Sequence, residues 1–196
     1  MDASELFTIK SNTTKPFEGQ VLLAEPMLNS LHFGRSVILL IEVSPKEGCF
    51  GIIINKPISV QIDRLSDDLP FFDAPVFVGG PVDENRLFFL HTLGDEVPES
   101  IKIMDGLYWG GDLDIIKSLI ISGQANRSNL RFFLGYAGWE SGQLEKELKE
   151  NTWAVGDINT HQIMTNHPEK LWSQLTEQLG GRYRYWKMFP KDPRMN

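Results

Sequence analysis

The sequence predicts an α+β fold in a single domain. Short segments rich in β-branched residues, bounded by turn residues, dominate the first half of the chain. Amphipathic helical segments come later and do not alternate regularly with strands, which argues against a doubly wound sheet. The 196 residues, 41% of them hydrophobic, suffice for a proper core, and no internal repeat or linker is visible.

Three parts are expected within this organisation. Residues 1–18 are polar and form a loose lead-in, residues 19–181 form the folded domain, and residues 182–196 form a basic and aromatic extension. The net charge of the whole chain is −7, whereas the extension alone carries +4. The body is therefore strongly acidic, which opposes general binding to nucleic acid phosphates.

Strands are predicted from short apolar segments that end at turn residues. The first three lie at 20–24, 36–43 and 49–55, and the sequence SPKEG between the last two predicts a hairpin. The segments 74–81 and 86–91 predict another pair of neighbouring strands. A further strand is expected at 130–135.

Helices are predicted where a capping residue precedes a periodic apolar pattern. Ser59 and Asp112 are suitable N-caps, so we expect a short helix over 59–65 and a longer one over 112–122.

Two more helices are expected near the C-terminus. One follows the glycine-rich segment after residue 135 and turns Leu144 and Leu148 toward the core. The other begins at Pro168 and ends at Gly180.

The chain shows no export or membrane signal. No apolar run approaches the roughly 20 residues that span a bilayer, and the N-terminus lacks a basic start followed by an apolar stretch. The single cysteine, Cys49, excludes an internal disulfide and fits a reducing compartment. We therefore expect a cytoplasmic protein.

No catalytic residue, metal site or cofactor is predicted. Cys49 has no histidine near it in sequence, and the four histidines form no HExxH or similar metal motif. Ser141 lies between a strand and a helix, but Trp139 and Gln143 replace the two glycines of a nucleophile elbow. An enzyme, for example a hydrolase, stays open only if a site assembles in three dimensions.

The residues considered for such an assembled site are His91, Glu25 and Asn55. For His91 at the end of a strand, a structural role is the competing interpretation.

Three segments at predicted strand ends, two of them rich in glycine, predict a ligand-binding cleft. They read INKP at 54–57, FVGGP at 77–81 and GYAGWESGQ at 135–143. If they meet, free backbone amides would suit an anionic ligand between aromatic walls. The candidate ligand-binding residues are Asn55, Gly79, Gly80, Tyr136, Gly138, Trp139 and Gln143. The alternative is that the glycines permit close packing and the aromatics fill the core.

The C-terminal segment GRYRYWKMFPKDPRMN alternates basic and aromatic residues, a pattern that can stack on single-stranded nucleic acid. No helix-turn-helix, zinc finger or RNP sequence accompanies it. Packing of these aromatics against the domain is the competing interpretation.

Taken in order, several motifs resemble those of the AlgH/YqgE family of bacterial proteins. They are GQVLLAEPML…FGRSVILLIE, GIIINKP, VGGPVDENRLFFLH, LGYAGWESGQLEKEL and HPEKLW, within residues 19–181. The resemblance implies a compact fold with a bent, mixed sheet and surrounding helices. It transfers no catalytic residues, and family members are often labelled transcriptional regulators. Ser30-Leu31 stands where the family often has Asp-Pro, so no role passes to a carboxylate there.

The leading hypothesis is thus a cytoplasmic regulator that acts indirectly. It would bind a small anionic metabolite or a protein partner, without membrane contact. An enzyme with an assembled site and a nucleic acid binder using the tail are the alternatives.

Overall fold

The structure is a computed structural model that describes residues 15–44 and 46–190. In this part of the chain, ten strands form one sheet. Their bounds are β1 Val21–Ala24, β2 Val37–Ser44, β3 Gly48–Ile53, β4 Pro57–Ile58, β5 Val76–Val78, β6 Val82–His91, β7 Ile101–Met104, β8 Leu107–Trp109, β9 Leu130–Trp139 and β10 Trp153–Gly156.

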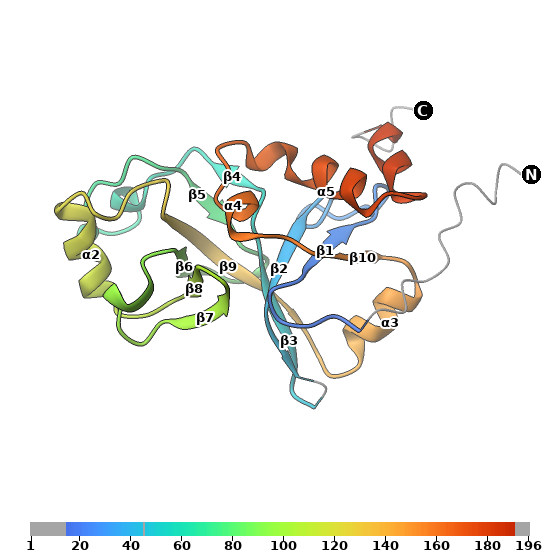
Figure 1. Cartoon of the computed structure of the whole chain (residues 1–196), viewed down its shortest axis with the longest axis horizontal. Coiled ribbons are helices and arrows are strands. Elements are labelled where there is room, and N and C mark those ends of the chain that lie inside the picture. The colour runs from blue at the N-terminus through green and yellow to red at the C-terminus, as the bar shows by residue number, and fades with distance from the viewer. Residues whose placement is uncertain (1–14, 45, 191–196) are drawn as a thin grey trace, which may run out of the picture.

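The described helices lie around this sheet (Figure 1). The α-helices are α2 Leu113–Ile121, α3 Gln143–Lys149, α4 Thr160–Ile163 and α5 Leu171–Leu179. Short 3-10 helices occur at Ile62–Arg64, Gly94–Glu96, Pro168–Lys170 and Tyr183–Met188. No helix in residues 15–44 or 46–190 is long and apolar enough to cross a membrane.

The sheet is mixed, and the α+β class is confirmed. Its main path runs β10-β1-β2-β3-β9-β6-β8-β7, with antiparallel neighbours throughout. Strand β5 pairs with β4 and joins β9 in parallel. The hairpin expected between β2 and β3 is present, because Ser44 pairs with Gly48 across its turn.

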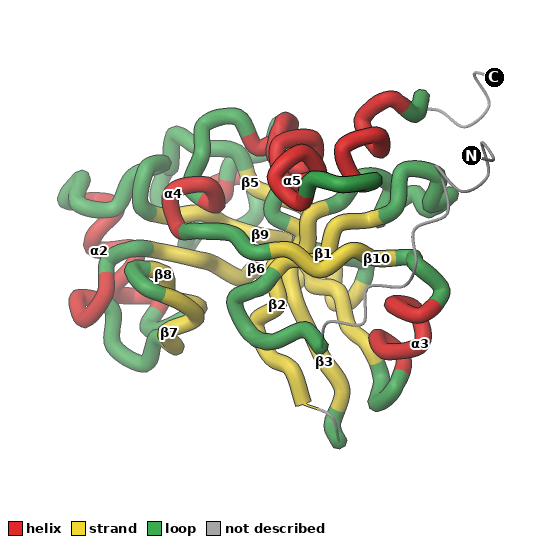
Figure 2. Tube along the Cα trace, turned by 45° about the vertical axis from the view of Figure 1, so that its right-hand side comes forward, coloured by secondary structure: helices red, strands yellow, loops and turns green. Residues whose placement is uncertain are grey.

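Strand β9 is the centre of the molecule (Figure 2). Near Phe133 it is bordered on one side by β5, through Phe77, and on the other by β6, through Phe88. The expectation that 74–81 and 86–91 pair with each other is therefore wrong, because β9 lies between them. Two adjacent apolar segments suggested a hairpin, and nothing local indicates the strand that separates them.

The strand expected at 130–135 continues to Trp139. Gly135 adopts a left-handed φ of 70°, which a glycine accepts without strain, so the chain changes direction while the ladder goes on. Beyond it, Gly138 and Trp139 pair with Phe50 and Cys49 of β3. The first part of the glycine-rich segment is thus strand, and β9 ends inside the segment at Trp139, later than expected.

Of the two N-caps predicted for the early helices, Asp112 is confirmed and Ser59 is not. The Asp112 carboxylate accepts hydrogen bonds from the amides of Asp114 and Ile115, at 2.8 and 3.2 Å, and α2 follows. The helix expected over 59–65 is only a 3-10 helix, Ile62–Arg64. Gln61 precedes that helix, so Ser59 is not its N-cap.

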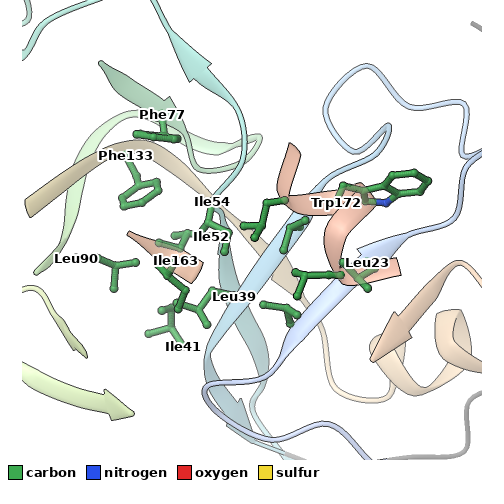
Figure 3. Close-up of a cluster of buried hydrophobic side chains, with 14 of the residues drawn as sticks. Leu23, Leu39, Ile41, Ile52, Ile54, Phe77, Leu90, Phe133, Ile163 and Trp172 are labelled. Atoms are coloured by element: carbon green, nitrogen blue, oxygen red, sulfur yellow. The ribbon is translucent and has the colours of Figure 1, made fainter. Parts of the chain in front are cut away.

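The central strands are buried on both faces, which explains their unbroken apolar runs. Alternate residues point to opposite sides, so Leu39 and Ile41 join one cluster whereas Ile38 and Leu40 join the other. Helices α4 and α5 cover the first face, where Ile163 and Trp172 approach Leu23, Leu39 and Ile54 (Figure 3). Helix α3 covers the second face.

A third cluster lies at the opposite end of the sheet from α3. There Ile116 of α2 packs with Phe132 of β9 and Phe89 of β6. The first half of β9 therefore belongs to the end that carries α2, and its second half to the end that carries α3 (Figure 1).

Candidate functional site

The glycines at 79–80 and 135 do meet, but they pack backbone against backbone. The amide of Gly79 donates to the carbonyl of Leu134 at 2.7 Å, and its carbonyl accepts from Ile53 at 2.7 Å. A Cβ added to Gly79 would lie 2.2 Å from the Gly135 carbonyl oxygen, and one added to Gly135 would lie 2.4 Å from that of Gly80. The expectation of a free amide is wrong for Gly79, because β9 already uses it.

Asn55 also has a structural position. Its side chain is buried, its Oδ1 accepts from the Val37 amide at 2.8 Å, and its Nδ2 donates to the Arg35 carbonyl at 3.0 Å. The amide thus holds the start of β2 in place. Segments 54–57 and 77–81 therefore lie side by side, with the Val78 amide donating to the Lys56 carbonyl at 2.9 Å, whereas segment 135–143 lines a different hollow.

A hollow of about 790 Å³ nevertheless opens beside the second half of β9. Its walls come from β3 and β9 on one side and from β6 and β8 on the other. It is lined by Glu42, Glu47, Gly48, Cys49, Phe50, Val82, Arg86, Phe88, Trp109, Tyr136, Gly138, Trp139, Glu140 and Gln143.

Four of the seven residues proposed from the sequence line this hollow: Tyr136, Gly138, Trp139 and Gln143. Asn55 and Gly79 are not among its lining residues. Gly80 borders a separate, smaller hollow of about 360 Å³ that also contacts Lys56 and Glu84.

Gly138 contributes no side chain to the hollow. Gly138 lies opposite Phe50 in the β3–β9 ladder and is exposed. A Cβ built on it would meet only the ring of Tyr136, at 3.4 Å, which is an ordinary contact. Because neither the backbone nor close packing requires glycine there, its main structural effect is to leave Phe50 and Tyr136 uncovered.

Four aromatic rings form the floor of the hollow and contact one another in a closed circuit. The centroid of Phe50 lies 6.0 Å from Trp109 and 5.9 Å from Tyr136. Phe88 lies 5.3 Å from Trp109, nearly parallel to it, and 5.9 Å from Tyr136. Phe50, Phe88 and Tyr136 are only partly buried. Mutual edge and stacking contacts hold these rings while part of their surface stays accessible.

The rim of the hollow is acidic. Glu42, Glu47 and Glu140 are exposed lining residues, and Arg86 is the only cationic side chain among the lining residues. The Arg86 guanidinium lies over the ring of Phe88, 5.0 Å from its centroid. The rim therefore carries three negative charges against one positive charge.

Glu147 explains why the motif GYAGWESGQLE combines tryptophan with glutamine. One carboxylate oxygen accepts from the indole nitrogens of Trp139 and Trp153, at 2.8 and 2.6 Å. The other accepts from the Gln143 amide at 2.8 Å, while the Gln143 oxygen accepts from the Glu140 backbone at 3.0 Å. The first turn of α3 is thereby tied to the end of β9, which fixes one wall of the hollow.

Cys49 lies in the same wall, partly exposed. Burial raises the pKa of its thiol, and the carboxylates of Glu145 and Glu42 raise it further. Cys49 therefore remains a thiol at neutral pH, a state of low nucleophilicity.

The three residues considered for an assembled catalytic site are placed apart. His91 is fully buried, and both of its ring nitrogens contact backbone: Nε2 donates to Gly110 O at 3.1 Å, and Nδ1 accepts from the Leu93 amide at 3.3 Å. Burial lowers the pKa of this imidazole, which keeps it neutral. Glu25 follows β1 in the other half of the molecule, where burial raises the pKa of its carboxyl. No hydrogen bond or ion pair joins them or Asn55 among the described residues.

Within residues 15–44 and 46–190, no group of three or more His, Cys, Asp or Glu side chains could hold a metal ion.

The described part of the basic-aromatic extension packs on α5. Trp186 is buried and stacks on Trp172 with centroids 6.2 Å apart, and Lys187 pairs with Glu177 at 3.1 Å. Residues 191–196 of the extension lie outside the described residues.

Sequence reasoning missed three of the four rings of the floor and all four charged residues of the rim. Phe50, Phe88 and Trp109 lie in strands whose patterns indicate core, and Arg86 and Glu42 look like ordinary exposed charges. Only the strand order, which places β8 and β3 on either side of the hollow, brings them together.

A model of a family described as AlgH-like matches residues 21–184. Relatives named UPF0301 protein include one from Parabacteroides distasonis, 41% identical over 97% of both chains, and one from Bacteroides thetaiotaomicron, 42% identical over 98% of both. The solution structure of the AlgH protein from Pseudomonas aeruginosa is similar with a TM-score of 0.68 and 28% identity, covering 87% of this chain and 93% of that one. A crystal structure from Corynebacterium diphtheriae shares the fold, with a TM-score of 0.72 at 23% identity over 96% of this chain and all of that one.

Proposed function

The chain belongs to the AlgH-like family, and we propose that it is a binding protein that uses the hollow beside Gly138 to receive a ligand or a segment of a partner. In this proposal its regulatory effect is indirect and follows from the occupied or empty state of the hollow. Because its single cysteine favours a reducing compartment, the proposal places this role in the cytoplasm.

The observation that carries the proposal is the uncovered aromatic floor. Phe50, Phe88 and Tyr136 keep accessible surface although they pack on the main core cluster. A concave surface of aromatic side chains with a few charged groups at its edge is the usual form of a ligand site. Gly138 adds no side chain over this floor, although a Cβ there would make only an ordinary contact with Tyr136.

The chemistry of the lining favours binding over catalysis. The ionisable lining groups are three glutamates, one arginine, one tyrosine and a thiol whose pKa is raised. Among these described residues, no two ionisable side chains form an ion pair or hydrogen bond. A general base needs such a partner or a suitable neighbour.

The ligand charge in this proposal differs from the sequence-based expectation. The expected anionic metabolite depends on free backbone amides, and the Gly79 amide already donates to the Leu134 carbonyl. The acidic rim instead favours a positively charged or neutral group. A protein partner remains part of the proposal, since a side chain of a partner can fill the same hollow.

Thermal unfolding in the presence of small-molecule panels tests the proposal. Amines, amino acid amides, nucleotides and organic acids are added to the wild type, to Gly138→Trp, which fills the hollow, and to Lys102→Trp, which places the same ring on edge strand β7 outside it. At about 100 times its Kd a ligand stabilises by about 2.7 kcal/mol, a shift of roughly 5–10 °C for this chain length.

We expect at least one class to raise the Tm of the wild type and of Lys102→Trp but not of Gly138→Trp. Equal shifts in all three proteins, or no shift with any class, would contradict the proposal.

A further inference from the structure

We infer that the hollow is built for an organic cation, an ammonium or guanidinium group, and that Arg86 is the internal cation that such a ligand displaces. This inference rests on the proposed function and specifies its ligand. It depends on three independent features: the ring surfaces, the carboxylates at the rim, and the segment that carries Arg86.

The aromatic floor already binds a cation of the same chain. The Arg86 guanidinium lies 5.0 Å from the Phe88 centroid, within the usual range for attraction between a cation and the face of a ring. Tyr136 and Phe50 present further partly exposed ring surface next to Phe88. A second cation with an apolar or aromatic body therefore finds the same interaction on neighbouring rings.

The carboxylates of the rim lack a cationic partner in the part of the chain that the structure describes. In the described residues, no salt bridge joins Glu42, Glu47 or Glu140 to a lysine, arginine or histidine. Arg86 likewise forms no salt bridge there, although it is a lining residue of the same hollow. The rim thus keeps an unbalanced negative charge, which attracts cations and repels anions over distances of about one Debye length.

Arg86 lies on a segment that can move without breaking the ladder. Val82 pairs with Tyr136 and Leu87 pairs with Leu134, so four residues of β6 face the single residue Gly135. This bulge, residues 83–86, is exposed along its length, and the bulged residues take no part in the register. The guanidinium can therefore leave Phe88 at the cost of one exposed contact.

If Arg86 instead bound the ligand directly, replacing it would change the affinity in the opposite direction. If the hollow received a carboxylate or phosphate, Arg86 would be its direct partner, and removing its charge would weaken binding. If the ligand is a cation, Arg86 competes with it, and removing its charge strengthens binding. The sign of the change therefore decides between the two.

Calorimetric titrations with defined probes test the inference. The probes are benzyltrimethylammonium, N-acetyl-arginine amide, the neutral N-acetyl-citrulline amide, and phenyl phosphate. They are added to the wild type, Gly138→Trp, Arg86→Gln, the double variant Glu42→Gln/Glu140→Gln, and Lys102→Gln, which removes a positive charge from exposed strand β7 outside the hollow. All substituted positions are exposed, and an unchanged Tm shows that each variant folds.

For Arg86→Gln we expect both cations to bind about threefold more tightly, and for the double variant about threefold more weakly. Lys102→Gln should change neither Kd by more than about 1.5-fold at 150 mM salt. A pentapeptide with a central arginine separates the two sources of the cation. Tighter binding of the peptide than of the amide indicates a partner's side chain, and equal binding indicates a free metabolite; both outcomes support a cation.

Tighter binding of phenyl phosphate than of the cations, lost in Arg86→Gln, would overturn the inference while leaving the proposed function intact. If no probe of any charge binds the wild type more tightly than it binds Gly138→Trp, the inference and the proposed function both fail.

Discussion

Two groups of glycines, the first made of Gly79, Gly80 and Gly135 and the second of Gly138 alone, have opposite roles although they look alike in the sequence. Gly135 lies against Gly79 and Gly80 so closely that any Cβ would overlap backbone atoms. Gly138, three residues later, faces open space beside Tyr136. The first group permits a close approach of backbones, and the second leaves a surface uncovered. The role of a glycine is thus set by what lies where its side chain would be.

The surroundings of the two groups differ in the same way. In the first half of β9, Phe132 and Phe133 are fully buried, and even Arg131 is covered. Burial lowers the pKa of that guanidinium to about 10. In the second half, Tyr136 is partly exposed and Gly138 is exposed. One strand therefore combines a dry scaffold with an accessible site.

The largest expected effect comes from replacing a glycine of the packed region with alanine, the next larger residue. Gly135→Ala places a Cβ 2.4 Å from the Gly80 carbonyl oxygen at a φ of 70°. Overlap and backbone strain together should lower the free energy of unfolding by about 4 kcal/mol, or the Tm by roughly 8–16 °C.

Gly138→Ala is the matched control for that substitution, and we expect it to stay within about 0.5 kcal/mol of the wild type. Urea unfolding of both variants measures the contrast. Similar losses at the two positions would show that the glycines do not differ.

A smaller effect is expected at Glu147, which ties α3 to the end of β9. Glu147→Ala leaves the indole nitrogens of Trp139 and Trp153 without their shared acceptor in a buried setting. We expect a loss of about 2–3 kcal/mol in urea unfolding. Because the same change frees Gln143, ligand affinity at the hollow should fall as well. Glu150→Ala, at the exposed C-cap of α3, serves as control.

The packed region should also be the acid-sensitive one. Burial lowers the pKa of His91, so the unfolded state, with a pKa of about 6.5, binds this proton more readily than the folded state. The stability that neutral His91 provides is complete above that value and declines as the pH falls toward the lowered pKa. Between pH 7.5 and 5.5 we expect a loss of up to about 1 kcal/mol.

The variant His91→Gln should remove that part of the pH dependence while being less stable at pH 7.5. An unchanged pH profile would mean that His91 is not the group responsible.

The smallest expected effect is a change in reaction rate at Cys49. Because burial and two carboxylates raise the pKa of the thiol, alkylation by iodoacetamide at pH 7.5 should be slower than for a free cysteine. Saturation with an organic cation should slow it a further few-fold, since Cys49 lines the hollow. Equal rates with and without a ligand that is shown to bind would place that ligand elsewhere.

The sequence was informative where local patterns decide structure. The strands at 20–24, 36–43 and 49–55, the cap at Asp112 and the family motifs are all confirmed. The pairing of 74–81 with 86–91 was wrong because the separating strand β9 comes about 40 residues later in the chain. Sheet order depends on such distant contacts, which local patterns do not carry.

Only part of the candidate site could be located from the sequence, because the rest depends on the order of distant strands. Tyr136, Gly138, Trp139 and Gln143 share one continuous segment, and they line one hollow. Asn55 and Gly79 belong to other segments that were expected to converge, and they instead serve packing. The floor residues Phe88 and Trp109 join the site only through the order of β6 and β8 in the sheet.

Indole nitrogen–proton NMR signals offer the most direct test that the open half of β9 is where a ligand binds. Trp109 lies in the floor of the hollow, whereas the Trp172 indole donates to the Ala24 carbonyl at 2.9 Å under α5. Signals are assigned with single Trp→Phe variants, and benzyltrimethylammonium is titrated into the wild type. We expect the Trp109 signal to move progressively while that of Trp172 stays in place. Movement of Trp172 with a fixed Trp109 would contradict binding at the hollow.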